Sequence, residues 1–455
     1  MVRAISPLDG RYEETVSALQ EYFSEYALFK YRCKVEVEYF ISLSSLKLKN
    51  FTLSADMHDS LRNIYLKFSP EDALQIKDIE KTTKHDIKAV EYFIKNKLKV
   101  LGISALEEWV HFGLTSQDIN NTAIPMLLRD ATVDILMPIL EECTDKLYKN
   151  GHQWKSIPML SHTHGQAASP TTMGKEVFVF VERLNKQLHT LKSYEYCGKF
   201  GGASGNFNAH KISFPEINWI DWADEFLQHT LGLTRQHYTT QIAHYDEIAE
   251  YLQLLSRINT ILIDLCRDMW TYISMDYFKQ KIVEGEVGSS AMPHKVNPID
   301  FENAEGNLGL SNAVAHHLAE KLPVSRLQRD LTDSTVLRNI GVPIAHTYLS
   351  VKSIMKGLDK LILQPEKLTT DLNSNWIILA EAIQTILRRE GYPKPYEVLK
   401  ELTRGKSTIS QNELHQFLEQ LNLPMELKNE LTALRPENYI GYAADEFKNL
   451  FKPTH

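Results

Sequence analysis

The sequence predicts an all-α protein with a few short extended segments, and three observations support that prediction. The 455-residue chain is 43% apolar and 24% charged, as expected for an ordinary globular protein. Residues 233–284 contain neither Gly nor Pro, the residues that most often interrupt helices. Within that stretch, apolar residues recur every three or four positions from Ile248 to Ile273, which is the helical period.

The periodic stretch predicts one helix of about 35 residues, roughly 50 Å long. Its apolar residues fall on several sides, because Leu254, Ile261 and Ile263 lie off the main stripe. A helix with this pattern is buried among other helices. Because it is also far longer than an average helix, we expect a central bundle of long helices that other subunits complete.

Further helices are expected at residues 131–150, 171–196, 312–322 and 344–363. Pro138 falls inside the first of these and is expected to kink it. Strand-like alternation is scarce, and QHYTTQI at 236–242 is the best candidate for a short strand.

Shifts in composition predict three domains. Residues 1–111 form a charged N-terminal helical domain, residues 112–364 the long-helix domain, and residues 365–455 a C-terminal helical domain with shorter helices and more loops.

The overall composition excludes several classes of protein. A net charge of −8 disfavours nucleic acid as the main partner, although local Lys and Arg can still bind a small anion. The N-terminal segment lacks the apolar core of a signal peptide, and no apolar run is long enough to cross a membrane. The four cysteines have no zinc or redox spacing, which predicts free thiols in a reducing cytoplasm: Cys33, Cys143, Cys197 and Cys266.

Four loop-like stretches carry residues suited to chemistry, and the first is GSSAMPHKVNP at 288–298. Small residues there can expose backbone N–H groups to an anion. Lys295 adds a positive charge and Asn297 a hydrogen-bond donor. Ser289 can act as a nucleophile, a donor or a proton acceptor. The alternative interpretation is a loop that only caps a helix.

The second stretch, SHTHGQAASP at 161–170, carries His162 and His164. No acidic or Cys partner stands nearby to complete a metal site. One of the two histidines can instead be a general acid or base, or both can be structural.

The third stretch, TTKHDIKAVEYF at 82–93, places His85 and Asp86 at a probable helix start, which either binds an anion or is a plain cap. The fourth, SRLQRDLTDSTVLRN at 325–339, combines arginines with hydroxyls, a set that suits phosphate or carboxylate unless it is a solvated helix face. Its members are Arg326, Arg329, Ser334, Thr335 and Arg338.

The sequence contains no Walker A loop and no G-x-G-x-x-G motif; GGASGN at 201–206 is only Gly-rich. Acids, bases and anion-binding groups are present without a recognisable metal or cofactor motif. This combination predicts cofactor-free proton-transfer chemistry on an anionic substrate, without naming the reaction.

Several motifs then resemble a known family. GSSAMPHKVNP resembles the signature loop of the fumarase/aspartase superfamily. Together with SPLDGRY, TTKHDIKAVEYF, TSQDINN, THGQ and LTDSTVLRN, it resembles the adenylosuccinate lyase family of the longer bacterial type. The resemblance extends from Ser6 to about Tyr442. It implies a three-domain helical fold that assembles into a homotetramer with shared active sites.

The resemblance also implies the chemistry: release of fumarate from adenylosuccinate, giving AMP, and from SAICAR, the succinylated imidazole carboxamide ribotide, giving AICAR. It implies no metal and no cofactor. By motif, Ser289 is the base and His164 the acid, Lys295 stabilises the developing negative charge, and His85 assists the acid near the phosphate.

The same resemblance implies a set of substrate-binding residues. The succinyl carboxylates and the reacting nitrogen would be held by Thr115, Ser116, Gln241, Ser289, Lys295 and Asn297, with Asn303 as a further candidate. The phosphate and ribose would be held by Arg11, Tyr12, Lys84, His85, Asp86, Arg329, Ser334, Thr335 and Arg338.

The chain departs from the family pattern at three places. Lys84 stands where Asn is expected, Ala167 where Pro is common, and TTQIAHYDEIAE at 239–250 differs around Gln241. The alternatives are another fumarate-releasing lyase of the superfamily, of the argininosuccinate lyase, aspartase or fumarase type, a serine acyl hydrolase using Ser289, and a non-enzymatic protein on a lyase scaffold. The Arg and Ser cluster at 329–338 disfavours the first, and the absence of a nucleophile elbow disfavours the second.

Overall fold

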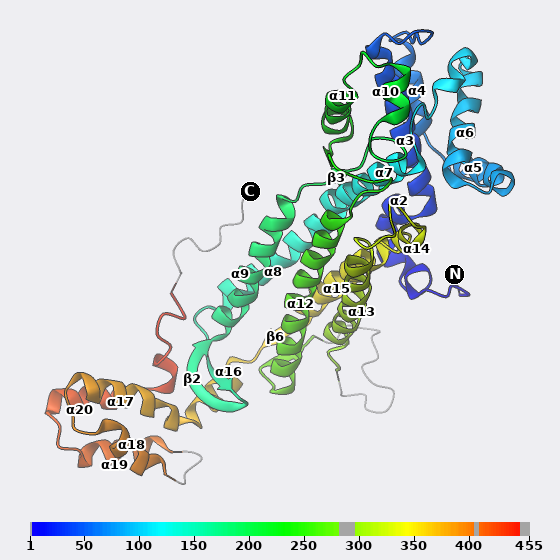
Figure 1. Cartoon of the computed structure of the whole chain (residues 1–455). Coiled ribbons are helices and arrows are strands. Elements are labelled where there is room, and N and C mark those ends of the chain that lie inside the picture. Colours follow the sequence, from blue (N-terminus) through cyan, green and yellow to red (C-terminus); the bar gives the residue numbers. More distant parts are fainter. Residues whose placement is uncertain (1, 282–295, 405–408, 446–455) are drawn as a thin grey trace. The chain divides into compact units, whose positions relative to one another are not determined.

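The computed structural model describes residues 2–281, 296–404 and 409–445, and Figure 1 shows that these residues are mostly helical. The prediction of an all-α protein with short extended pieces is therefore confirmed. In the part of the chain that the structure describes, no helix is both long and apolar enough to cross a membrane.

The α-helices are α1 Glu13–Val16, α2 Gln20–Phe23, α3 Glu25–Leu43, α4 Met57–Leu66, α5 Pro70–Thr83, α6 Asp86–Val100, α7 Ser116–Ala131, α8 Met137–Trp154, α9 Met173–Lys192, α10 Asn208–Ser213, α11 Trp219–Glu225, α12 Asp246–Ser274, α13 Ile299–Lys321, α14 Thr332–Leu337, α15 Gly341–Lys360, α16 Pro365–Asn373, α17 Ala380–Arg389, α18 Pro395–Thr403, α19 Gln411–Gln420 and α20 Met425–Thr432. The strands are β1 Pro158–Thr163, β2 Gln166–Thr172, β3 Cys197–Gly198, β4 Thr234–Arg235, β5 Phe278–Gln280 and β6 Leu361–Leu363. They form three two-stranded sheets: β1 with β2 and β5 with β6 are antiparallel, and β3 with β4 is parallel.

The long helix α12 has 29 residues, fewer than the predicted number. It begins only at Asp246, because Tyr245 has a left-handed backbone with φ of 63°. The Tyr245 hydroxyl is buried and donates to Asp333 Oδ2 at 2.9 Å while accepting from Asn121 Nδ2 at 2.8 Å. These contacts hold the preceding segment out of the helix.

The strand predicted at 236–242 is wrong. Only Thr234 and Arg235, just before it, pair as a strand. The segment is instead fixed by single contacts, such as the bond from Gln241 N to Gln328 O at 3.4 Å. The alternation of its side chains therefore does not indicate a strand paired in a sheet.

The irregularity predicted at Pro138 lies in the turn before it. A π-helical turn, Thr132–Leu136, joins α7 to α8, and Met137 N donates to Thr132 O across five residues. Pro138 cannot donate to the i−4 carbonyl, and its ring would crowd that carbonyl in a regular helix. The wider turn relieves the crowding.

The chain divides into two compact units. The first comprises residues 1–140, 188–260 and 306–350, and the second comprises residues 141–187, 261–305 and 351–455. The three predicted domains remain a prediction.

The first unit has a large aromatic-rich core around α3, which includes Phe29, Tyr39, Phe93, Phe200 and Phe226. Where α12, α13 and α15 meet in this unit, three buried polar residues bond one another. Asn259 Nδ2 donates to Ser311 Oγ at 2.9 Å, and Thr347 Oγ1 donates to Asn259 Oδ1 at 2.9 Å. Because buried polar groups need specific partners, this triad fixes the register of the three helices.

The second unit has its own aliphatic core in the C-terminal helices, with Leu372, Leu379, Ile383, Leu414 and Leu418 fully or almost fully buried. The helices here are short, and α16 and α18 begin with Pro at the first helical position. Ser410 forms a capping box with Glu413 at the start of α19.

Candidate active site

The first unit contains an open cavity of about 410 Å³ that gathers predicted site residues from three separate segments. They come from the α5–α6 junction, the start of α7 and the neighbourhood of α14. Predicted residues that line the cavity are Lys84, His85, Asp86, Ser116, Arg329, Ser334 and Arg338.

The α5–α6 junction is shaped by its two end residues. Lys84 ends α5 in a left-handed conformation with φ of 54°, and His85 is the N-cap of α6. His85 Nδ1 accepts a hydrogen bond from Lys88 N at 3.2 Å. Nδ1 is thus an acceptor, so the proton of the neutral ring lies on Nε2. The helix start was expected to be either a plain cap or an anion site. His85 caps the helix, and its side chain is still 54% exposed, so it remains accessible to a ligand.

Asp86 is anchored by a buried arginine that sequence reasoning missed. Arg32 Nη2 donates to Asp86 Oδ2 at 2.7 Å, and Arg32 Nε donates to Asn120 Oδ1 at 2.9 Å. Burial acts to raise the pKa of Asp86, but the charge of Arg32 and the hydrogen bonds outweigh it and lower the pKa overall. Asp86 therefore stays ionised and fixes the junction.

Arg329 is the centre of the α14 side of the cavity. Its Nη2 donates to Ser334 Oγ at 3.0 Å and its Nη1 donates to Gln241 Oε1 at 3.2 Å. Its Nε lies 3.7 Å from Asp333 Oδ1, beyond hydrogen-bonding distance, and neither atom has a hydrogen-bond partner among the described residues. Arg329 thus joins the predicted Ser334 to the predicted Gln241.

Arg338 is exposed and lines the cavity, whereas Thr335 is exposed and not among the lining residues. The hydroxyl of Thr335 donates to Leu331 O within its own helix at 3.5 Å. Besides the buried Arg32 and three carboxylates, the lining therefore has two exposed cations, Lys84 and Arg338, and the half-buried Arg329, with hydroxyl and imidazole donors beside them. Such a set favours a phosphate or carboxylate ligand.

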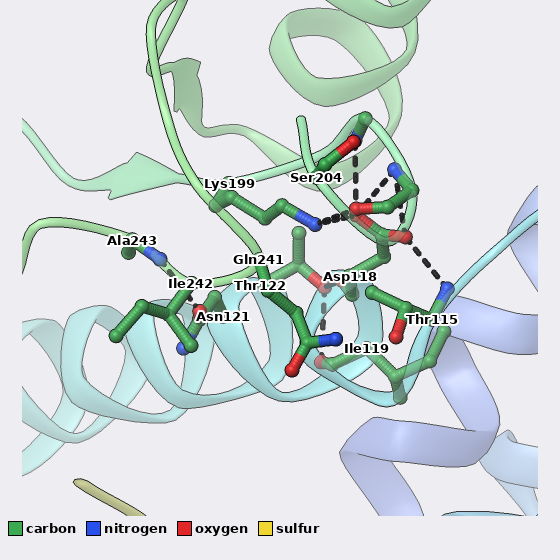
Figure 2. Close-up of polar contacts among 12 residues, drawn as sticks. Thr115, Asp118, Ile119, Asn121, Thr122, Lys199, Ser204, Gln241, Ile242 and Ala243 are labelled. Carbon is green, nitrogen blue, oxygen red and sulfur yellow. Dashed lines mark hydrogen bonds and ion pairs between the residues drawn. The ribbon is translucent and has the colours of Figure 1, made fainter. Parts of the chain in front are cut away.

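The start of α7 brings Thr115 and Ser116 to the same region. Thr115 is the N-cap, and its backbone N–H donates to Asp118 Oδ2 at 2.8 Å (Figure 2). Ser116 lines the cavity, as does Gln117, which is 1% exposed. Gln117 Oε1 has no hydrogen-bond partner among the described residues, which leaves a buried acceptor beside the ligand space.

His164 lies in the second unit in the turn of the β1–β2 hairpin, and the rest of the predicted loop at 161–170 forms the two strands. His164 and Gly165 both have positive φ, 54° and 72°, as a two-residue type I′ turn requires. His162 pairs with Ala167 in the ladder one step before the turn. Both histidines are exposed. Sequence reasoning did not recognise this motif as a hairpin, although its central His-Gly dipeptide is a turn signal.

The remaining predicted residues are not brought into the cavity. Arg11 is exposed and packs its guanidinium 5.9 Å from the Tyr12 ring. Asn297 just precedes α13, and Asn303 Nδ2 donates to Ser353 Oγ within the second unit at 2.8 Å. Ser289 and Lys295 lie outside the described residues.

The described residues include no group of three His, Cys, Asp or Glu side chains that could hold a metal ion. Sequence reasoning missed five buried polar residues: Arg32 inside α3, Gln117, Asp118 and Asn120 in the first turns of α7, and Lys199 directly after β3. A single sequence signals them only weakly, because nothing local shows that these polar side chains are buried.

Comparisons with known proteins agree with this architecture. Residues 10–313 match the family model described as Lyase, and residues 325–440 match the model described as Adenylosuccinate lyase C-terminal. The chain is 57% identical to an adenylosuccinate lyase from Dictyostelium discoideum, with 97% of each chain covered. It is 49% identical to one from Escherichia coli K12, with 98% of each covered.

Two solved structures share the fold at low sequence identity. The first is a 3-carboxy-cis,cis-muconate lactonizing enzyme from Pseudomonas putida, with a TM-score of 0.75, 20% identity and 94% of each chain covered. The second is a fumarate lyase from Mesorhizobium, with a TM-score of 0.76, 19% identity, and 94% of this chain and 96% of the other covered. The full-length matches at high identity and the two family models establish that the chain is a lyase of the adenylosuccinate lyase family.

Proposed function

We propose that this enzyme eliminates fumarate from adenylosuccinate, giving AMP, and from SAICAR, giving AICAR, and so acts in purine nucleotide biosynthesis. The observation that carries the proposal is the cavity that joins Lys84 and His85 to Arg329, Ser334 and Arg338. Both substrates carry a phosphate, and arginines paired with hydroxyl donors suit that group.

In this proposal the cavity binds the ribose phosphate end. Arg329 is already oriented by Ser334 and Gln241, so it presents a fixed cation. Arg338 and Lys84 add mobile charges, and His85 offers its Nε2 proton as a donor. Arg11 and Tyr12 complete the phosphate and ribose contacts by family resemblance, with Thr335 and Asp86 as further binding residues.

The succinyl end is assigned to a second group of residues, Thr115, Ser116, Gln241, Lys295 and Asn297, with Asn303 as an added candidate. During elimination, negative charge grows on the carboxylate next to the carbon that loses its proton. Donors fixed in advance toward that carboxylate stabilise the transition state more than the ground state. Lys295 supplies the positive charge in this group.

Two proton transfers complete the reaction. The Ser289 alkoxide takes the proton from the succinyl carbon, and the electron pair is held as an aci-carboxylate. The C–N bond then breaks, fumarate forms, and His164 gives its proton to the leaving nitrogen. A serine is a weak base, so its alkoxide requires the neighbouring Lys295 charge and backbone donors. His85 assists the acid from the phosphate side.

We further propose a homotetramer in the cytoplasm whose active sites combine residues of different subunits. Two observations support this. His164 is exposed at a hairpin tip in the second unit, and two apolar residues remain exposed in the first, Val133 in the π-helical turn before α8 and Leu310 on α13. The described cysteines are free, as in a reducing compartment.

One assay tests the proposed function. Purified enzyme is mixed with adenylosuccinate, SAICAR or argininosuccinate, and fumarate release is followed by absorbance. Release from the first two substrates alone is the expected result. Release from argininosuccinate alone, or from none of the three, contradicts the proposal.

A further inference from the structure

The inference concerns a buried ion pair and a Gly-rich segment that the proposed mechanism does not use. Asp118 and Lys199 are both fully buried, and Lys199 Nζ lies 2.7 Å from Asp118 Oδ1. Figure 2 shows the pair beside the start of α7. A buried ion pair is seldom a net source of stability, so its geometry needs another explanation.

The Asp118 carboxylate accepts from four donors on two separate parts of the chain. They are Lys199 Nζ, Thr115 N at 2.8 Å, Gly201 N at 2.9 Å, and Gly202 N at 3.1 Å to Oδ2. Lys199 Nζ also donates to Gly202 O at 2.6 Å. One carboxylate therefore ties the N-cap of α7, which precedes Ser116, to the segment 201–205.

The segment 201–205 in turn touches the chain that leads to Gln241. Gly205 has φ of 80°, and a Cβ at this position would lie 2.5 Å from Thr239 O and 2.8 Å from Thr239 Oγ1. Only Gly permits this approach. Gly202 makes a similar approach to Gly113 O, where a Cβ would lie 3.2 Å away.

A second link runs one helical turn further along α7. Asn121 accepts from Ala243 N at 2.8 Å and donates to the Tyr245 hydroxyl at 2.8 Å, which donates to Asp333. Asn121 thus contacts the chain just after Gln241, whereas Asp118 is linked through the segment 201–205 to the chain just before it. Gln241 itself bonds Arg329 at 3.2 Å.

We propose that Asp118 is a positioning residue, which sets Thr115 and Ser116 relative to Gln241 through Lys199 and the segment 201–205. The inference rests on the proposed function, because those three residues are assigned there to the succinyl end. A displacement of about 1 Å at such a distance from the chemistry can lower the rate about 100-fold.

The test uses full-length enzyme carrying Asp118→Asn, with Glu38→Gln as the matched control. Glu38 is also a buried carboxylate with three donors, Arg62 Nε at 2.8 Å, Arg62 Nη2 at 3.0 Å and the Tyr65 hydroxyl at 2.5 Å, but it contacts no predicted site segment. Asp118→Asn is expected to lower kcat/KM for adenylosuccinate about 100-fold. Its Kd for AMP, which lacks the succinyl group, is expected to stay within about threefold of wild type.

A second pair of variants tests the proposed positioning role if Asp118→Asn does not fold. Gly205→Ala pushes Thr239 away. Gly102→Ala is its control, because Gly102 has a similar positive φ, 76°, and no atom lies within 4 Å of the new Cβ. We expect kcat/KM to fall about tenfold for Gly205→Ala only, again with AMP binding retained. Folding is checked by circular dichroism at the assay temperature.

Three results overturn the inference. The first is a folded Asp118→Asn or Gly205→Ala enzyme with kcat/KM within about threefold of wild type. The second is an equal loss of kcat/KM in the matched control variant. The third is a parallel loss of AMP affinity in the test variant. Either result would mean that the substitution damages the fold in general rather than the position of the succinyl-binding residues. Wild-type activity is measured first, so an inactive wild type identifies failure of the proposed function, which the inference cannot survive.

Discussion

The cavity of the first unit and the hairpin of the second unit present their candidate residues in opposite ways. Around the cavity, buried or half-buried partners hold the proposed binding residues: Arg32 fixes Asp86, Ser334 fixes Arg329, and Asp118 fixes the Thr115 backbone. On the hairpin, His164 is exposed at a two-residue turn. A single chain therefore holds its proposed binding residues more firmly than its proposed acid, which is the difference that a shared active site would produce.

The largest expected effect tests the hairpin. His164→Gln should lower kcat by about 10³-fold, within the range of general acid catalysis, and leave the Kd for AMP nearly unchanged. The measurement is fumarate release at saturating adenylosuccinate. His162→Gln is the matched control, since His162 is exposed on the same hairpin and pairs with Ala167. Equal activity of the two variants would remove His164 from the mechanism.

The next prediction tests whether different chains supply the acid and the base. His164→Gln and Ser289→Ala enzymes, unfolded and refolded together in equal amounts, should regain about a quarter of the wild-type sites if the two residues come from different subunits. Each variant refolded alone is the control, and native mass spectrometry verifies mixed tetramers. Mixed tetramers without activity would mean that one chain supplies both residues.

A smaller effect is expected from the cavity. Arg338→Gln should raise KM for adenylosuccinate about 10- to 100-fold with little change in kcat, because a charge-assisted phosphate contact is made in ground state and transition state alike. Arg326→Gln is the control, since Arg326 is exposed, pairs with Asp330 at 2.7 Å and is not among the lining residues. A fall in kcat without a change in KM would contradict a binding role.

The last prediction concerns stability of the first unit rather than activity. Burial lowers the pKa of His210 from 6.5 to about 4, with the nearby Asp118 and Lys199 acting in opposite directions. As the pH falls, His210 therefore takes up a proton in the unfolded chain before it does so in the folded chain. This favours the unfolded chain, so stability present above pH 6.5 is lost between pH 6.5 and about 4. At 1.36 kcal/mol per pKa unit, the loss is about 3 kcal/mol.

The measurement is the thermal midpoint of wild type and His210→Gln across this pH interval. Wild type should lose more stability than the variant, which has no titrating ring at this position. Parallel curves for the two proteins would show that His210 is not the group responsible.

The sequence alone determined the helical class, since the apolar period of the long helix and the scarcity of alternation follow from local spacing. It also marked the candidate motifs for chemistry, because Ser, His, Lys and Arg in Gly- and Pro-marked stretches stand out from helical surroundings. It overestimated the length of α12 and predicted a strand at 236–242 that does not form. Tyr245, just before α12, is held by Asn121 and Asp333, residues 124 and 88 positions away in the chain.

Only the tertiary structure decided which of these residues meet. Lys84, Ser116 and Arg338 share one cavity because α5, α7 and α14 pack in one unit, and no local pattern encodes that meeting. The buried supports are equally invisible in sequence. Asp118 reads as an ordinary helix-start carboxylate, since its four donors come from Thr115, Lys199, Gly201 and Gly202, most of them some 80 residues distant. Hydrogen bonds of this range are selected by packing of the whole unit, because burial leaves each charge no water to bind in place of its partners.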